Sequence, residues 1–364
     1  MNHVFPEIKN KLGFGFMRLP KKDDQVDIPT TMQMVDTFLS KGFNYFDTAH
    51  GYLSGQSELV LRECLTRRYP REQYILTNKL SDGFFKTAED IRPLFQLQLE
   101  QCGVDYFDFY LMHAMNKERH QRYLDMGAYD VVQALKAEGK LRHMGISFHD
   151  SAETLDRILT DRPDIEAVQL QFNYVDYEDS RVESRKCYEV CRKHGKPVFV
   201  MEPVKGGSLA TLTPDAAALL PNGSPASYAL RFVSGFEGIV AILSGMSTLE
   251  QVEENTELMG NCTPLTPEEQ KTIEKVRTIY QSQHRIPCTV CRYCTDGCPA
   301  GIEIPELFAL LNETRKSTGA EVRPYEDFTA TGAHCLDCGQ CEAACPQHLQ
   351  IRTLLKEVDK IFKK

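Results

Sequence analysis

The sequence predicts an α/β protein, a (β/α)₈ barrel (TIM barrel) followed by a small, mainly helical domain, and two observations carry this prediction. Over most of the chain, eight short apolar runs alternate with segments of helical periodicity, whereas after residue 282 these runs stop and the cysteine density rises. Eight such units over about 250 residues fit a closed barrel better than an open sheet. We therefore place a barrel at residues 1–282 and a second domain at residues 283–364, with a doubly wound sheet as the alternative for the first.

Each predicted strand is a short apolar run that precedes a helical pattern. The eight runs are Gly13–Leu19, Phe43–Ala49, Tyr74–Leu80, Phe107–Ala114, Leu141–Phe148, Ala167–Asn173, Pro197–Pro203 and Ile239–Met246. Gly42, Gly139 and Gly195 are expected to end three of the helices between them. Thr87 and Ser151 are expected to cap two helices. No predicted strand leads into a GxGxxG turn, which weakens the doubly wound alternative.

Composition and charge exclude several classes of protein. The chain has 364 residues, of which 42% are apolar and 26% are charged, and its net charge is −9. No apolar run approaches the roughly 18 residues of a membrane span, and the first residues lack the apolar stretch of a signal peptide. The acidic balance and the lack of a long basic run disfavour a nucleic-acid partner. We therefore expect a cytoplasmic protein with neither a membrane nor a nucleic acid as partner.

Eight of the 13 cysteines fall in the second predicted domain and form a repeated motif. The pattern C-x2-C-x2-C-x3-C-P occurs twice, once at Cys288, Cys291, Cys294 and Cys298 and once at Cys335, Cys338, Cys341 and Cys345. This spacing is typical of bacterial [4Fe–4S] ferredoxins, in which the fourth cysteine of each run binds the other cluster. We therefore predict two clusters, one held by Cys288, Cys291, Cys294 and Cys345 and the other by Cys335, Cys338, Cys341 and Cys298.

Two other uses of cysteine fit this pattern less well. Disulfides require an oxidising compartment, for which the sequence shows no export signal. Zinc sites generally use pairs of CxxC rather than three closely spaced cysteines and a fourth before proline. The stretch between the motifs contains a helix-like piece, Pro305–Leu311, so this part resembles the helical ferredoxin domains appended to redox enzymes. The five remaining cysteines are interpreted as packing residues: Cys64, Cys102, Cys187, Cys191 and Cys262.

Polar side chains gather at the ends of three successive predicted strands. Asp47 ends the second strand and Tyr52 follows it, while Lys79 and His113 end the third and fourth. In a barrel these ends meet on one rim, where active sites lie. A lysine ammonium lowers the pKa of a nearby tyrosine, so this set could polarise a carbonyl and protonate the alkoxide as a hydride arrives. Taken singly, each residue has an ordinary structural explanation, such as an aspartate that caps a helix.

These residues resemble the aldo/keto reductase family. The segment Gly13–Pro20 is similar to the opening strand of that family, and Phe46–Tyr52 is similar to its signature with the catalytic tyrosine. The resemblance spans roughly residues 10–260. It implies a (β/α)₈ barrel, a nicotinamide cofactor and a carbonyl or alcohol substrate. It also implies Tyr52 as the general acid, with supporting roles for Asp47, Lys79 and His113.

The same resemblance implies where the nicotinamide cofactor binds. Ser147 and Gln169 match residues that hold the carboxamide, and Met201 replaces the aromatic side chain that stacks on the ring. The implied adenosine-phosphate loop contributes Gly245, Met246, Gln251, Glu254 and Asn255. NADPH-specific members carry a Lys and an Arg in place of Gly245 and Gln251. Because a 2′-phosphate needs cationic donors, NADH is at least as good a candidate as NADPH.

A hydride carries two electrons, whereas an iron–sulfur cluster transfers one at a time. A gate such as a flavin would connect the two, although no sequence feature demands one. Three functions stay open. The first is an oxidoreductase whose clusters exchange electrons with a partner or with an unidentified cofactor at the barrel site. The second is a reductase of a small carbonyl compound whose clusters are structural or dock a partner, and the third is an electron-transfer module that uses the barrel as a binding platform.

Overall fold

The computed structural model describes residues 4–316 and 321–363, which divide into two compact units. The first unit comprises the chain up to Glu178 together with Val182–Pro203 and Leu230–Pro264. The second unit comprises Asp179–Arg181, Val204–Ala229 and the chain from Leu265 onward. Two segments that precede residue 282 in the sequence thus pack with the C-terminal residues. The predicted domain boundary at residue 282 stays a prediction.

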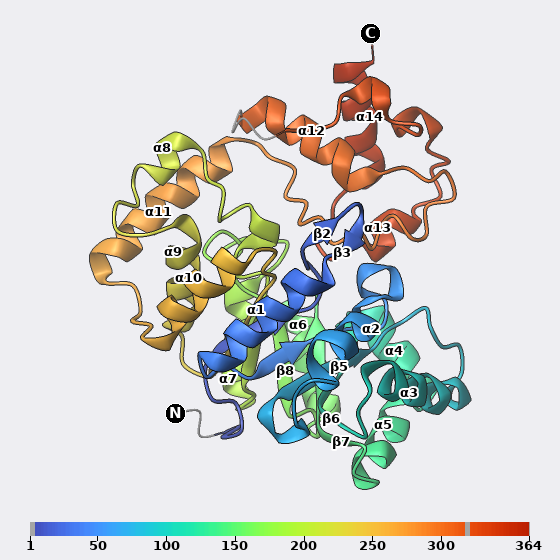
Figure 1. Ribbon diagram of the computed structural model, residues 1–364. Coiled ribbons are helices and arrows are strands. Elements are labelled where there is room, and N and C mark those ends of the chain that lie inside the picture. Colours follow the sequence, from blue (N-terminus) through green and yellow to red (C-terminus); the bar gives the residue numbers. More distant parts are fainter. Residues whose placement is uncertain (1–3, 317–320, 364) are drawn as a thin grey trace. The chain divides into compact units, whose positions relative to one another are not determined.

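Eight parallel strands close into a barrel in the first unit (Figure 1). They are β1 (Leu12–Gly15), β4 (Tyr45–Asp47), β5 (Ile75–Leu80), β6 (Phe107–Met115), β7 (Leu141–Phe148), β8 (Ala167–Gln171), β9 (Val198–Met201) and β10 (Ile239–Ser244). Each strand pairs with the next along the chain, and β10 pairs with β1 to close the ring. The predicted barrel is confirmed and the doubly wound alternative is wrong. A short hairpin that was not predicted, β2 (Lys21–Lys22) and β3 (Gln25–Val26), follows the first strand.

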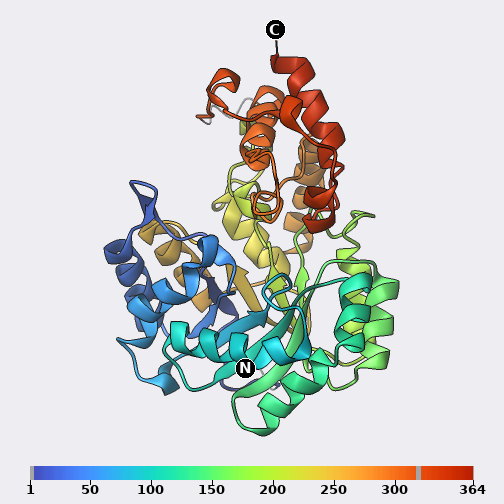
Figure 2. The same ribbon diagram turned by 90° about the vertical axis from the view of Figure 1, so that its right-hand side faces the viewer.

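Helices surround the barrel strands of the first unit (Figures 1 and 2). They are α1 (Ile28–Ser40), α2 (Ser57–Leu61), α3 (Ala88–Cys102), α4 (Lys117–Asp125), α5 (Ala128–Ala137), α6 (Ala152–Asp161), α7 (Ser184–Lys193) and α10 (Leu249–Gly260). The predicted cap Thr87 forms a capping box at α3, and Ser151 Oγ accepts a hydrogen bond from the backbone N–H of Thr154 at α6. The three predicted end glycines all have positive φ, at 87°, 74° and 65°.

Apolar side chains fill the end of the barrel where the strands begin. Phe109 and Phe199 pack edge to face with ring centroids 5.0 Å apart, and Phe5, from the segment before β1, packs against Phe109 at 4.9 Å. These three rings and Tyr45 are at most 4% exposed. The opposite ends of the strands therefore carry the polar side chains of the site described below. Outside the motifs, Cys64, Cys102, Cys187 and Cys191 are buried and Cys262 is partly buried.

The described part of the second unit contains helices and no strands. These are α8 (Pro214–Ala217), α11 (Pro267–Ser282), α12 (Ile304–Lys316), α13 (Gln340–Ala344) and α14 (Ile351–Phe362), and α9 (Pro225–Ser234) begins there. A small core between α12 and α14 includes Leu307, Phe308, Leu355 and Val358. The mainly helical character predicted for the C-terminal part is confirmed. Within the described residues, no helix has the length and apolar character required to cross a lipid bilayer.

Candidate active site and iron–sulfur centre

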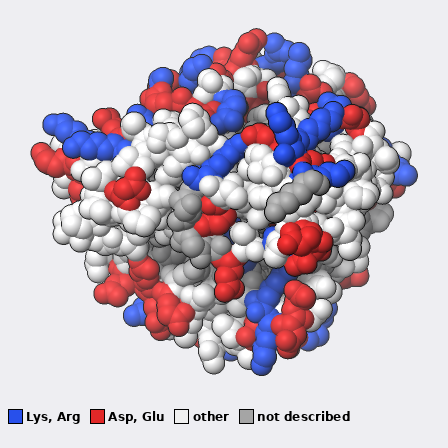
Figure 3. Space-filling view, turned by 90° about the horizontal axis from the view of Figure 1, so that it is seen from above, with Lys and Arg blue, Asp and Glu red and all other residues white. Residues whose placement is uncertain are grey.

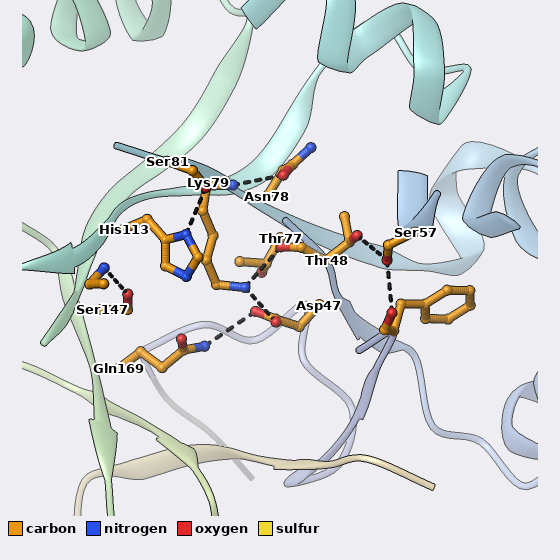
Figure 4. Close-up of polar contacts among 12 residues, drawn as sticks. Asp47, Thr48, Ser57, Thr77, Asn78, Lys79, Ser81, His113, Ser147 and Gln169 are labelled. Carbon is orange, nitrogen blue, oxygen red and sulfur yellow. Dashed lines mark hydrogen bonds and ion pairs between the residues drawn. The ribbon is translucent and has the colours of Figure 1, made fainter. Parts of the chain in front are cut away.

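The four residues predicted to act on a carbonyl come together at the C-terminal ends of the strands, and Figure 4 shows three of them, Asp47, Lys79 and His113. Lys79 Nζ donates to Asp47 Oδ1 at 2.6 Å and to the backbone oxygen of Thr48 at 2.8 Å. The same ammonium lies 4.7 Å from the ring centroid of Tyr52, and that ring is 5.9 Å from the imidazole of His113. All four predicted side chains belong to residues that are at most 9% exposed. The barrel thus gathers residues from β4, β5, β6 and one loop into a single group.

Burial shifts the protonation equilibria of this group. It lowers the pKa of Lys79 and raises that of Asp47, while the ion pair between the two opposes both shifts. Burial also holds the pKa of His113 well below its ordinary value, and the charge on Lys79 lowers it further. His113 is therefore neutral at pH 7, so that one of its ring nitrogens is a donor and the other an acceptor.

Ser81 contacts His113 and is a residue that the sequence interpretation missed as part of the catalytic set. Its Oγ lies 2.7 Å from His113 Nδ1. When the hydroxyl donates to Nδ1, the ring keeps its proton on Nε2, which then serves as a donor. The signal was present in the sequence, because Lys79 and Ser81 are two residues apart and alternate residues of a strand share one face.

Buried hydrogen bonds hold the loop that carries the predicted general acid. Thr48 Oγ1 and Ser57 Oγ are 2.7 Å apart and join the two ends of this loop. Next to them, Glu58 is fully buried and accepts from Asn78 at 2.8 Å, and its other oxygen lies 2.8 Å from His50 Nδ1. The tyrosine is therefore presented by a loop that is tied at both ends.

The two predicted carboxamide-binding residues lie beside this group (Figure 4). Gln169 Nε2 donates to Asp47 Oδ2 at 3.2 Å, and Ser147 Oγ accepts from the backbone N–H of Ala114 at 2.7 Å. The hydroxyl hydrogen of Ser147 and the amide oxygen of Gln169 take no part in these two bonds. Met201 ends β9, the next strand of the ring, and is partly buried.

The predicted adenosine-phosphate loop lies between β10 and α10. Gln251 Oε1 accepts from the backbone N–H of Ser247 at 2.7 Å, and Asn255 Nδ2 donates to Ser244 Oγ at 3.3 Å. Met246 is buried, whereas Glu254 is exposed. The side chain of Gln251 is therefore turned back onto its own loop.

Arg18 supplies a cation at this loop that the sequence interpretation missed. A methyl group on Gly245 would lie 3.0 Å from Arg18 Cδ, and Ser247 Oγ donates to the backbone oxygen of Arg18 at 2.7 Å. The guanidinium of Arg18 is 3.4 Å from Glu202, the residue after β9. Because β1 and β10 are neighbours in the closed ring, a residue near the start of the chain reaches a loop that lies more than two hundred residues later.

The two cysteine motifs share one backbone geometry in the turn from the first cysteine to the residue after the second. Val290 N–H donates to Cys288 Sγ, and Asp337 N–H donates to Cys335 Sγ, both at 3.4 Å. Val290 and Asp337 have φ of 56° and 53°, and the residue after the second cysteine has φ of 66° in one motif and 77° in the other. The repeat seen in the sequence is therefore also a structural repeat.

A small cavity, partly open to solvent, lies among the cysteines of the later motif. Its lining includes Cys298, Cys335, Cys338 and Cys341, the four residues predicted for one cluster, together with apolar side chains such as Ile302 and Leu355. Thiolates in an otherwise apolar setting are the donor set that iron–sulfur clusters use. These residues therefore fit a cluster.

The cysteines predicted for the other cluster also lie near one another. Burial raises the pKa of the Cys294 thiol, and the neighbouring thiols of Cys288, Cys291 and Cys345 raise it further. Among the described residues, no three His, Cys, Asp or Glu side chains converge on a position for one metal ion. In a cubane each thiolate binds a different iron, so its ligands surround a volume rather than a point.

Comparisons with known protein families match both parts of the chain. Residues 11–219 match the model of the aldo/keto reductase family, and residues 287–349 match the model of the 4Fe-4S dicluster domain. The NADH-specific methylglyoxal reductase of Escherichia coli is 26% identical over 274 residues, which cover 61% of this chain and 81% of that protein. L-galactose dehydrogenase of Arabidopsis thaliana is 26% identical over 302 residues, which cover 74% of this chain and 90% of that protein.

Solved structures share the fold of the barrel. An aldo-keto reductase from Klebsiella pneumoniae in complex with NADPH has a TM-score of 0.61 at 18% identity and covers 73% of this chain and 90% of its own. The holo form of aldo-keto reductase AKR11C1 from Bacillus halodurans has a TM-score of 0.60 at 24% identity, with coverages of 73% and 91%. Since the family model covers more than half of the residues, this chain belongs to the aldo/keto reductase family, as an oxidoreductase with an appended 4Fe-4S domain.

Proposed function

We propose that this protein is an NAD(P)H-linked oxidoreductase that interconverts a carbonyl compound and its alcohol, with Tyr52 as general acid and two [4Fe–4S] clusters for electron transfer. The observation that carries the proposal is the buried pair of Lys79 and Asp47 beside Tyr52 and His113 on one rim of the barrel. The substrate is a small molecule, and the clusters imply a partner that exchanges single electrons.

The four residues divide the proton chemistry between them. Tyr52 gives its proton to the substrate oxygen as that oxygen gains negative charge, and the Lys79 ammonium favours the phenolate that remains. Asp47 keeps Lys79 charged against the effect of burial. His113, whose Nδ1 is held by Ser81, donates from Nε2 to the same substrate oxygen. A bound nicotinamide supplies the hydride to the carbonyl carbon, so that one hydride and one proton together complete the reduction.

The cofactor proposal rests on the residues beside the rim. Ser147 and Gln169 lie next to the catalytic group, where a carboxamide would meet one hydroxyl donor and one amide acceptor. Arg18 offers a cation over Gly245, in a loop that has no Lys or Arg of its own from Ser244 to Asn255. We propose that Arg18 binds a phosphate of the cofactor. The E. coli relative is named as NADH-specific and the Klebsiella structure contains NADPH, so either nicotinamide fits this family.

The proposal of two clusters rests on the two sets of cysteines. One set lines a cavity, and the other consists of thiols that influence the pKa of Cys294. Each set combines three cysteines of one motif with the last cysteine of the other. A flavin, which would convert hydride into single electrons, is not required by any of these residues.

The general acid is tested by Tyr52→Phe in anaerobically purified protein. The variant should lose about 10²–10⁴-fold in the rate of carbonyl reduction, because the phenol proton is gone, while the iron–sulfur absorption stays unchanged. The natural control is Tyr69→Phe, which removes a hydroxyl that bonds to Asp36 on the outside of the barrel. Full reductase activity in Tyr52→Phe would show that the assignment is wrong.

The cluster ligands are tested by Cys298→Ala and by iron analysis. The native protein should contain the iron and inorganic sulfide of two [4Fe–4S] clusters. Cys298→Ala should disturb the cluster of the later motif, because this cysteine lines the cavity formed by Cys335, Cys338 and Cys341. EPR spectra that show damage only to the cluster of the earlier motif would overturn the crossed ligation.

A further inference from the structure

The two motif loops share one backbone geometry but differ in exposure. Thr289 and Leu336 both occupy the position after the first cysteine of a motif, yet Thr289 is 2% exposed and Leu336 is 68% exposed. The cysteines of the later motif are also the more exposed ones. Cys294 of the earlier motif is 7% exposed, whereas its counterpart Cys341 is partly buried and Cys338 is exposed. The two cluster sites are therefore alike in their local fold and unlike in their surroundings.

A turn of the same compact unit accounts for the buried position of Thr289. The turn is η4 (Lys205–Gly207), and a methyl group on Gly206 would lie 2.6 Å from the backbone oxygen of Thr289. Gly206 also has a φ of 64°, so both its backbone conformation and its close approach favour glycine. This turn begins four residues after Met201, the last residue of β9. The loop of the earlier motif is thus packed against the chain that leaves the predicted nicotinamide-binding strand.

The loop of the later motif instead presents an apolar side chain beside paired charges. Asp337 lies 3.3 Å from Lys356, and Glu342 lies 2.8 Å from Arg352, so the charged groups around the loop offset one another. Positive and negative side chains are also interspersed on the face shown in Figure 3. An apolar contact with little net charge suits a small, transient interface of the kind that electron-transfer proteins form.

We propose that the two clusters have different tasks. The cluster of the later motif exchanges electrons with a small one-electron carrier protein, and the cluster of the earlier motif is the internal relay. The carrier docks on Leu336 and Cys338 through an apolar patch around its own redox centre. The inference rests on the proposed function, because it requires that both clusters are present.

The transfer involves electrons alone. The carrier loses one electron and the cluster of the later motif gains it. That cluster then returns to its oxidised state as the cluster of the earlier motif is reduced, and no covalent bond is made or broken. A second electron from the carrier would then stay on the cluster of the later motif, so that the two clusters together would hold the two electrons of one hydride equivalent, and the same sequence would run in reverse when electrons leave the protein.

The docking surface is tested by Leu336→Glu with the full chain and both clusters in place. A reduced bacterial-type ferredoxin is the probe protein, and reduced methyl viologen is a small probe that needs no docking surface. Stopped-flow bleaching of the cluster absorption should be slowed about tenfold with the ferredoxin and be unchanged with the dye. The matched control is Ile361→Glu, which adds the same charge at another exposed apolar residue of the unit, 50% exposed on α14. An unchanged rate in Leu336→Glu, or an equal loss in Ile361→Glu, would overturn the proposal.

The internal position of the other cluster is tested by Gly206→Ala. Its methyl group would press on Thr289, so the EPR signal of the earlier motif's cluster should shift while the signal of the later motif's cluster does not. The Cys298→Ala variant identifies the two signals. A shift confined to the cluster of the later motif contradicts the inference. Wild-type protein with only one cluster would refute the proposed function itself, whereas two clusters with no effect of Leu336→Glu would refute only the division of tasks.

Discussion

Replacing Asp47 by Asn preserves the shape of this side chain and removes the charge that faces Lys79. In the native protein the two groups are 2.6 Å apart, and their side chains are 0% and 5% exposed. Burial lowers the pKa of Lys79, and the carboxylate of Asp47 opposes that effect. In the variant only the effect of burial remains, so Lys79 should lose its proton at a lower pH than in the native protein. The limb of the pH profile on which reductase activity falls as pH rises should therefore move to lower pH.

The size of the effect follows from the burial of the pair. Removing one partner of a buried ion pair costs about 3–5 kcal/mol of unfolding free energy. Both side chains are too little exposed for solvent to screen the charge that remains. A lysine whose pKa is lowered in the folded state binds fewer protons there than when unfolded, so stability rises with pH. The loss of stability in the variant should therefore be largest at pH values where Asp47 of the native protein is ionised and Lys79 is charged, and smaller at alkaline pH. Reductase activity at neutral pH should fall about 10²–10⁴-fold.

The assay combines initial rates of carbonyl reduction across pH with urea unfolding at one neutral and one alkaline pH. Glu138→Gln is the matched control, because this carboxylate pairs with Arg92 on the surface and is 47% exposed. Such exposed pairs contribute about 0–1 kcal/mol, and the control should keep the native pH profile. If the profile of Asp47→Asn overlays that of the native protein, Asp47 does not hold the charge on Lys79 and the reasoning fails.

Three further changes test other parts of the structure. Ser81→Ala should lower kcat about tenfold, because His113 loses the hydrogen bond that fixes its tautomer, and Ser81→Thr should keep the activity. Arg18→Gln should weaken cofactor binding by about ten- to a hundredfold in a fluorescence titration with NADPH and NADH, whereas an unchanged Kd would exclude a phosphate contact. Gly145→Ala places a methyl group 2.7 Å from the backbone oxygen of Ala167 and should lower the unfolding free energy, measured in urea, by about 1–3 kcal/mol. In the control Gly260→Ala the added methyl group meets no neighbour within 4 Å, so the unfolding free energy should not fall in this way.

The barrel was predictable because strands buried on both faces form continuous apolar runs. All eight predicted runs overlap a strand, but the ends differ, in part because an apolar side chain can stay buried after its backbone has left the sheet. Phe16 is fully buried although β1 ends at Gly15. The hairpin of β2 and β3 was missed because its strands have two residues each and no apolar alternation. Its turn residues Asp23 and Asp24 have positive φ, which short hairpin turns require.

The main site residues were predictable for a different reason, namely that each lies near the C-terminal end of a strand. Asp47 ends β4, Lys79 is the residue before the end of β5 and His113 lies two residues before the end of β6, so the topology alone brings them together. Arg18 could not be assigned in this way, because its partners Gly245 and Glu202 are reached only when β10 closes on β1. Long-range closure of this kind leaves no local pattern in the sequence. The exposure difference between the two cysteine motifs was likewise invisible, since it depends on where one turn packs.

The barrel is expected to transfer a hydride, which carries two electrons, whereas an iron–sulfur cluster transfers one electron at a time. The chain's own residues limit how these two processes can be joined. In the proposed function, Tyr52, Lys79, Asp47 and His113 would move and stabilise a proton, and none of them would carry an electron. The two proposed clusters, each holding one electron, would match the two electrons of a hydride, which would give a reason for two motifs rather than one. A reductase with purely structural clusters would not need one motif to be exposed and the other covered. The contrast between Thr289 and Leu336 therefore favours clusters that take part in turnover, and the carrier experiment on Leu336→Glu distinguishes the two functions directly.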